Sequence, residues 1–227
     1  MTLALLACAL PSCAAAPPTP RPARPARPAR VAAAAPINWP RREVLDLALD
    51  AYRCGRDQGY FQQPTLTVID YSLPSTEKRL WVIDLQRSRI LFNELVAHGL
   101  NTGDTLAASF SNRVGSKQSS LGLFRTDETY FGRHGISLRL SGLEPGVNDQ
   151  ARDRAIVMHG ANYVSRQHIV TWGKLGRSWG CPALDAAVSP RIIDRIQGGS
   201  AVFAYYPDRN WLGSSPFLHC DARWAKK

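Results

Sequence analysis

The stretch Ala155-Ile156-Val157-Met158-His159-Gly160 indicates the kind of fold, because an uninterrupted apolar run leads up to a histidine. A short run of this kind is typical of a strand that is buried on both faces of a sheet. Such a strand would deliver His159 at its end. Functional side chains are often placed by connecting segments that a rigid scaffold holds in position.

A second stretch, Arg177-Ser178-Trp179-Gly180-Cys181-Pro182, places a cysteine 22 residues after His159. A thiol becomes a nucleophile when a histidine close in space acts as its base. Gly180 lets backbone N–H groups approach a substrate carbonyl, because glycine has no Cβ. Either residue alone would more often belong to the core, but the pair predicts a cysteine acyl-transfer site with Cys181 and His159 as catalytic residues.

The remaining pattern predicts a mainly β, β-rich α+β domain of antiparallel strands with a few short helices. Apolar residues recur at helical spacing from Ile37 to Gly55, and Gly55 is expected just past the helix end. Further on the period changes to two, which indicates strands joined by polar turns. The expected strands contain Thr67 to Leu73, Trp81 to Leu85, Ile90 to Val96, Ile136 to Leu140, 155–158 and Ala201 to Tyr206, with a helix from Ser189 to Gln197.

The first 36 residues are predicted to export and tether the domain at 37–227. An apolar segment followed by small residues makes 1–16 a secretory signal. A second interpretation is a lipoprotein signal with Cys13 or Cys8 acylated, which would anchor the protein to a membrane. Residues 17–36 repeat Arg-Pro-Ala and form a proline-, alanine- and arginine-rich linker, either a semi-rigid spacer or a segment without a role.

The charge points to an anionic polymer as partner. The chain of 227 residues has a net charge of +10, and +6 remains without the four arginines of 1–36. This excess is spread along the chain and forms no nucleic-acid motif, and the export signal argues against a nucleic-acid partner. Bacterial cell wall is an anionic polymer that would match the basic excess as well as nucleic acid would.

Three cysteines lie outside the predicted signal: Cys54, Cys181 and Cys220. Cys54 lies at the close of the first expected helix and Cys220 lies in the C-terminal tail, so a bridge between them would link the two ends of the domain. An odd number leaves Cys181 free. We expect no metal or other cofactor, because the spacing of His159, His168 and Cys181 fits no structural zinc pattern.

The two motifs resemble those of the YkuD-type L,D-transpeptidase catalytic domain, in the branch with a Gly-Arg-Ser-x-Gly-Cys-Pro signature. The matching stretches are 159–165 (His-Gly-Ala-Asn-Tyr-Val-Ser) and 176–183 (Gly-Arg-Ser-Trp-Gly-Cys-Pro-Ala). The resemblance covers roughly residues 60–207. It implies a β-rich fold in the periplasm or cell envelope. The implied reaction cleaves the stem peptide of peptidoglycan after the L-centre of diaminopimelate, releases D-alanine, and passes the acyl group to an amine or to water.

The resemblance also suggests roles for further residues. The predicted substrate-binding residues are Arg177, Ser178, Tyr163 and His134. Backbone N–H groups of Trp179, Gly180 and Cys181 are the predicted donors to the oxyanion. A backbone carbonyl near Gly160 is predicted to hold the imidazole. Two departures stand out: Trp179 replaces the histidine of most relatives, and Ala183 replaces a common arginine. Arg177 is therefore the candidate for the substrate carboxylate. We expect Cys181 to react as a thiolate paired with protonated His159.

Three other functions remain open at this level. A hydrolase, such as an L,D-carboxypeptidase or a wall amide hydrolase, would use the same acyl-enzyme. A non-catalytic wall-binding protein would retain the fold alone, and Trp179 and Ala183 would favour it. A nucleic-acid-binding module has only the basic excess in its support. The sequence does not indicate an oligomeric state.

Overall fold

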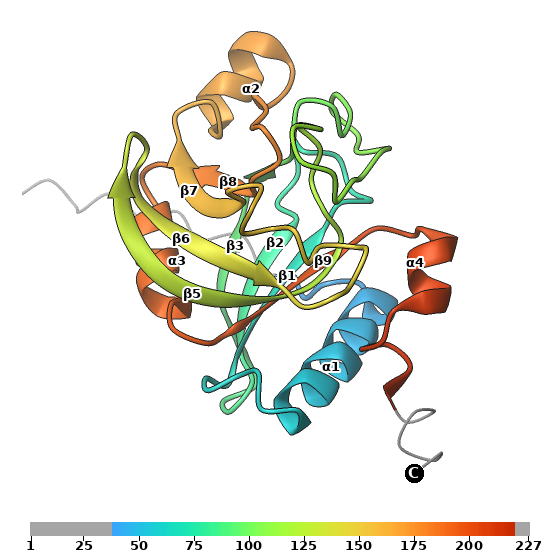
Figure 1. Ribbon diagram of the computed structural model, residues 1–227. Coiled ribbons are helices and arrows are strands. Elements are labelled where there is room, and N and C mark those ends of the chain that lie inside the picture. The colour runs from blue at the N-terminus through green and yellow to red at the C-terminus, as the bar shows by residue number, and fades with distance from the viewer. Residues whose placement is uncertain (1–37, 221–227) are drawn as a thin grey trace, which may run out of the picture. The chain divides into compact units, whose positions relative to one another are not determined.

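The computed structural model describes residues 38–220, and these form a single nine-stranded sheet with four helices. Figure 1 shows the sheet bending through the middle of the domain, with helices at its margins. The strand order is β3-β2-β1-β9-β5-β6-β7-β8-β4. The mainly β class with a few short helices is therefore confirmed. The predicted signal of 1–16 and linker of 17–36, with Cys8 and Cys13, lie outside the described residues.

One half of the sheet is formed by strands from both ends of the domain. Its members are β1 (Thr65–Asp70), β2 (Leu80–Asp84), β3 (Arg89–Glu94) and β9 (Ala201–Tyr205). β1 pairs antiparallel with β2 but parallel with β9, with Leu66 opposite Ala201. The expectation of only antiparallel strands misses this parallel pairing, because it joins segments more than a hundred residues apart in sequence.

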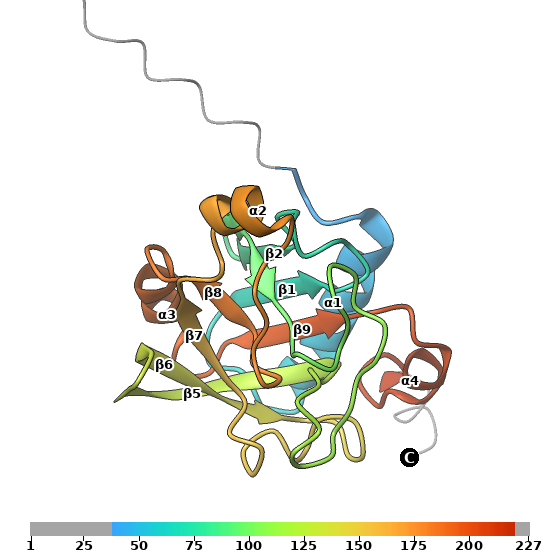
Figure 2. The ribbon, with the colours of Figure 1, turned by 90° about the horizontal axis from the view of Figure 1, so that it is seen from above.

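The other half carries the two motifs. A long hairpin of β5 (Gly122–Gly132) and β6 (Gly135–Gly142) pairs through β6 with β7 (Val157–Ala161). β7 pairs parallel with β8 (Ala183–Asp185), and β8 pairs antiparallel with β4 (Val96–Ala97). Figure 2 shows β7 and β8 side by side above the β5–β6 hairpin.

The two edges of the sheet are consecutive in sequence. The segment Ile90 to Val96, predicted as one strand, is divided at Leu95 into β3 at one edge and β4 at the other. Consecutive Cα atoms are only about 3.8 Å apart, so the two edges lie close together. The sheet therefore folds back on itself where β3 ends and β4 begins.

Burial of β1 and β2 differs from the predicted alternation, whereas the burial on both faces predicted for the apolar run is found in β7. Every residue of β1, β2, β7 and β9 is buried, so both faces of these strands are covered. α1 (Arg42–Asp57) packs against β1 and β9, and α3 (Ser189–Ile196) packs against β6 and β7. A strand covered on both faces shows continuous burial whether its sequence alternates or not.

The first helix continues past the predicted end. Gly55 is a buried residue inside α1, and a Cβ there would lie 2.5 Å from Cε2 of Phe61. Close packing of this aromatic ring therefore explains the glycine. The left-handed glycine that follows the helix is Gly59, with φ of +80°.

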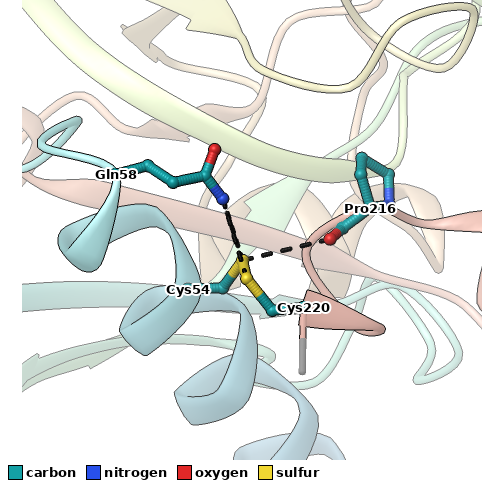
Figure 3. The surroundings of a disulfide bond; sticks show 4 residues. All are labelled: Cys54, Gln58, Pro216 and Cys220. Carbon is teal, nitrogen blue, oxygen red and sulfur yellow. Dashed lines mark hydrogen bonds between the residues drawn. A yellow bond between two sulfur atoms is a disulfide. The ribbon is translucent and has the colours of Figure 1, made fainter. Parts of the chain in front are cut away.

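The predicted Cys54–Cys220 disulfide is present, with the two Cα atoms 5.8 Å apart. Figure 3 shows it joining α1 to the C-terminal segment, with the side-chain amide of Gln58 directed at the sulfurs. Nε2 of Gln58 lies 3.1 Å from Sγ of Cys54. Cys181 is the free cysteine among the described residues. None of the helices in that part of the chain has the length and apolar character needed to span a membrane.

Candidate active site

Parallel pairing of β7 with β8 brings the two motifs together. His159 of β7 is the register partner of Ala183 in β8, and Cys181 precedes Ala183 by two residues. The backbone N–H of Val157 points at Sγ of Cys181, at 3.5 Å. His159 and Cys181 both line one cavity of about 440 Å³. His159 lies in the middle of β7 rather than at its end, because the strand continues to Ala161.

The imidazole of His159 is held by its own neighbour. Nδ1 lies 2.9 Å from the carbonyl oxygen of Gly160, which confirms the predicted backbone contact. A carbonyl can only accept, so Nδ1 carries the proton and Nε2 keeps a free lone pair. Gly160 itself leaves no room for a side chain, since a Cβ there would lie 2.4 Å from Oγ of Ser189. The neutral tautomer is therefore the one that can act as a base.

The surroundings of the thiol favour its neutral form. Burial raises the pKa of Cys181, and the opposing effects of the Val157 N–H and of the Arg154 guanidinium are smaller. Sγ also lies 3.7 Å from the carbonyl oxygen of Ala155, which a thiol can donate to. Burial lowers the pKa of His159 at the same time. Both shifts run against the predicted thiolate–imidazolium pair and favour a neutral thiol beside a neutral imidazole at rest.

Ser178 organises the turn that carries the thiol. Its Oγ accepts a hydrogen bond from the N–H of Gly180 at 3.1 Å and donates one to the carbonyl of Cys181 at 2.6 Å. The Gly180 N–H is therefore already engaged in this turn. Of the predicted oxyanion donors, the N–H groups of Trp179 and Cys181 remain as candidates. Ser178 acts on the backbone of the turn, a role that the sequence motif alone does not reveal.

A long segment without regular structure, residues 99–120, supports this turn from behind. Oγ of Ser119 donates to the carbonyl of Gly180 at 3.0 Å. Gly99 forms a parallel bridge with Ser178, and a Cβ on Gly99 would lie 2.9 Å from Cα of Gly180. Sequence reasoning missed these supporting residues. Glycines and serines in a loop carry no periodic signal, and only the three-dimensional contacts identify them.

The cavity is strongly basic. Three arginines line it, Arg133, Arg154 and Arg177, and none of its lining residues in the described chain is an aspartate or glutamate. Nη1 of Arg177 donates to the carbonyls of Gly103 and Leu100, at 3.0 and 3.4 Å, so this side chain is partly engaged by the 99–120 segment. Tyr163 also lines the cavity, and burial raises its pKa to about 12. Arg133 and Arg154 form no ion pair within residues 38–220, and positive charge of this kind attracts an anionic substrate.

His134, predicted as a substrate-binding residue, lies in this cavity and packs on the imidazole of His159. Its ring stacks on that of His159 with centroids 4.5 Å apart. Nε of Arg133 donates to Nε2 of His134 at 3.0 Å. Both residues come from the turn between β5 and β6, which therefore forms one wall of the site.

Replacing His134 with glutamine should move the acid limb of Cys181 acylation to higher pH. Burial, to which the stacked ring of His134 contributes, is the main effect that lowers the pKa of His159, and the interactions with His134 and Arg133 lower it further. Removing His134 raises the pKa of His159 toward its usual value of 6.5. A base loses its function as pH falls through its pKa, so acylation would fail at a higher pH than in the wild type. Acylation by a carbapenem, followed by intact mass across the acidic range, measures this.

The matched control is His168→Gln. His168 lies in α2 (Arg166–Trp172), contacts Trp172, and does not line the cavity. An equal shift in both variants, or none in His134→Gln, would contradict the assignment. Trp172 is 67 % exposed and so does not cover the core. No three His, Cys, Asp or Glu side chains within residues 38–220 are grouped to hold a metal ion.

Comparison with known proteins identifies the domain. The family model described as the L,D-transpeptidase catalytic domain, YkuD_2, matches residues 38–205. This range includes both motifs and nearly all of the sheet. The search of curated proteins finds no match.

Solved structures with a partial likeness carry related descriptions. The helical cell shape determining protein Pgp2 of Campylobacter jejuni (K307A mutant) is 14 % identical, with a TM-score of 0.43, over 66 % of this chain and 50 % of that one. An L,D-transpeptidase of Mycobacterium smegmatis is 13 % identical, with a TM-score of 0.38, over 63 % and 59 %. This chain thus spans about half the length of the first. Since the family model matches most of the chain, the protein belongs to the YkuD_2 family of L,D-transpeptidase catalytic domains.

Proposed function

We propose that the protein is a cell-envelope enzyme that modifies peptidoglycan stem peptides through an acyl-enzyme on Cys181. The observation that carries this proposal is the meeting of Cys181 and His159 in one basic cavity, with Nε2 of His159 free to accept a proton. Membership of the L,D-transpeptidase family supports the substrate class. The basic cavity supports it independently, because stem peptides carry carboxylates.

In the proposed first step, Sγ of Cys181 attacks the carbonyl after the L-centre of diaminopimelate while its proton passes to Nε2 of His159. The backbone N–H groups of Trp179 and Cys181 are the donors available to the oxyanion. Loss of one such donor costs on the order of 10²–10³ in rate in other enzymes. Collapse of the intermediate breaks the C–N bond, and the departing amine of D-alanine takes the proton from His159. A thioester on Cys181 remains.

In the second step an acceptor amine or a water molecule attacks the thioester, and His159 takes its proton. The C–S bond then breaks, and the departing sulfur of Cys181 takes that proton back from His159. An amine from a second stem gives a 3→3 crosslink, and an amine of a protein gives an attachment to the wall. Water gives a shortened stem instead. This chemistry takes place outside the cytoplasm, where peptidoglycan lies.

Incubating the protein with purified sacculi and analysing the released muropeptides tests the proposal. New 3→3 dimers would show transfer to an amine. Shortened monomers with free D-alanine would show hydrolysis by the same acyl-enzyme. Muropeptides unchanged from those of the Cys181→Ala variant would contradict an enzymatic role and favour a wall-binding protein without activity.

A further inference from the structure

Two cations meet over one exposed tryptophan at the mouth of the cavity. Trp179 lines the cavity and is 65 % exposed. Nζ of Lys117 lies 4.9 Å from the centre of its ring, and Cζ of Arg133 lies 5.9 Å from it. Lys117 comes from the 99–120 segment and Arg133 from the turn between β5 and β6. We name these three residues the cation clasp.

Neither cation of the clasp has an acidic partner among residues 38–220. The polar side-chain contact of Arg133 is the one from Nε to His134, and Lys117 forms no ion pair there. By contrast, exposed Arg152 is bound to both Asp127 and Glu128. Contact with an aromatic ring is a weak attraction at an exposed site and leaves the positive charge in place. Both charges are therefore available to an anion.

The other two arginines of the cavity are less free. Arg154 donates to the carbonyls of Ser111 and Gln118 and to the hydroxyls of Ser116 and Ser120, so its guanidinium holds the 99–120 segment together. Arg177 donates to two carbonyls and lies 3.5 Å from Asp104. These two cations shape the site. Arg133 lines the cavity without an ion pair, and Lys117 places a second unpaired charge beside Trp179, which also lines it.

The backbone places Lys117 in a defined position. Its φ is +55°, a left-handed conformation that is unfavourable for a non-glycine residue. Its carbonyl accepts a hydrogen bond from Asn101 at 3.1 Å, and the space beside that carbonyl is closed to any side chain on Gly99. Strained backbone of this kind persists where the surrounding contacts determine it, and it is common at ligand sites.

We propose that the cation clasp binds a carboxylate of the donor stem peptide, an inference that rests on the proposed function. Trp179 is two residues from Cys181, so a carboxylate held by the clasp lies next to the acylated centre. Arginine binds a carboxylate through two parallel hydrogen bonds, and lysine adds a compact charge. Two carboxylates flank the scissile bond, that of the terminal D-alanine and that on the D-centre of diaminopimelate. The clasp thus takes the role first assigned to Arg177.

Isothermal titration calorimetry with the Cys181→Ala protein measures the affinity of the clasp for a peptide without turnover. The ligand is the tetrapeptide stem, compared with one analogue amidated at D-alanine and one amidated at diaminopimelate. Arg133→Gln and Lys117→Gln should each weaken binding of the tetrapeptide about tenfold, the scale of one charge-assisted hydrogen bond. Neither substitution should further weaken binding of the analogue that lacks the recognised carboxylate. The analogue whose binding is unaffected therefore identifies which of the two carboxylates the clasp binds. Work above neutral pH keeps His159 uncharged in every variant.

Arg113→Gln is the matched control, because Arg113 is an exposed arginine of the same segment and lies outside the cavity. It should bind the tetrapeptide like the parent. Parental affinity in Arg133→Gln and Lys117→Gln would overturn the clasp, as would a parent that does not bind the peptide. D-alanine release by protein with Cys181 intact reports the proposed function separately. Release by the wild type with no loss in the two clasp variants would overturn the clasp alone.

Discussion

Replacing His159 with asparagine is expected to slow acylation of Cys181 by about 10²–10⁴-fold, the range that a positioned general base contributes. Asparagine can still donate its amide N–H toward the carbonyl of Gly160, which His159 contacts at 2.9 Å. It has no basic nitrogen to accept the thiol proton. Because the thiol of Cys181 has a raised pKa, little thiolate is present without that base. The acylation rate is measured by quenching the carbapenem reaction at successive times and determining the intact mass of the protein.

His168→Asn is the control, since this histidine lies in α2 outside the cavity. It should acylate at the wild-type rate. Thermal unfolding of both variants checks that the fold is retained. An acylation rate in His159→Asn within a few-fold of the wild type would remove His159 from the mechanism.

Replacing both Cys54 and Cys220 with serine should lower the free energy of unfolding by about 2–5 kcal/mol. The bridge closes a loop with a sequence separation of 166, so it strongly restricts the unfolded chain. It also fixes the C-terminal segment to α1, where Cys54 is only 4 % exposed. Urea unfolding monitored by tryptophan fluorescence measures the loss. Acylation of the folded protein should be unchanged, because neither cysteine lines the cavity.

Reduction of the wild-type protein provides the matched comparison. Its urea midpoint should fall to that of the double serine variant, and reductant should leave the variant unchanged. Thiol counting on the unfolded, unreduced segment 38–220 should find one sulfhydryl, from Cys181. A wild-type midpoint that reductant does not move would contradict a stabilising disulfide.

Much of the fold could be predicted from periodicity. Val157 and Met158 of the predicted 155–158 strand do lie in the buried strand β7, whereas Ala155 is an exposed turn residue before it. The helix at Ser189 begins and ends close to the expected residues. The parallel pairs of β1 with β9 and of β7 with β8 were not predictable, because local sequence does not record which distant segment supplies a partner. The end of α1 was misplaced because Gly55 serves packing on Phe61 rather than helix termination.

The candidate site shows the same division. Cys181 and His159 follow from residue chemistry and spacing, and the structure brings them to one cavity. The thiolate–imidazolium pair stays a prediction. Burial raises the pKa of Cys181 and lowers that of His159, and this burial depends on contacts that the motif does not contain. Ser119 and Lys117 were missed for a related reason. They reach the site from a loop about sixty residues before Cys181 in the sequence.

The most direct test is the intact mass of the protein after mixing with a carbapenem or with the tetrapeptide donor, followed by peptide mapping. The account predicts a covalent adduct on Cys181 in the wild type and none in Cys181→Ala. In both proteins circular dichroism should report the same fold. An adduct of equal yield in Cys181→Ala, or a wild type that forms none while folded, would contradict the account.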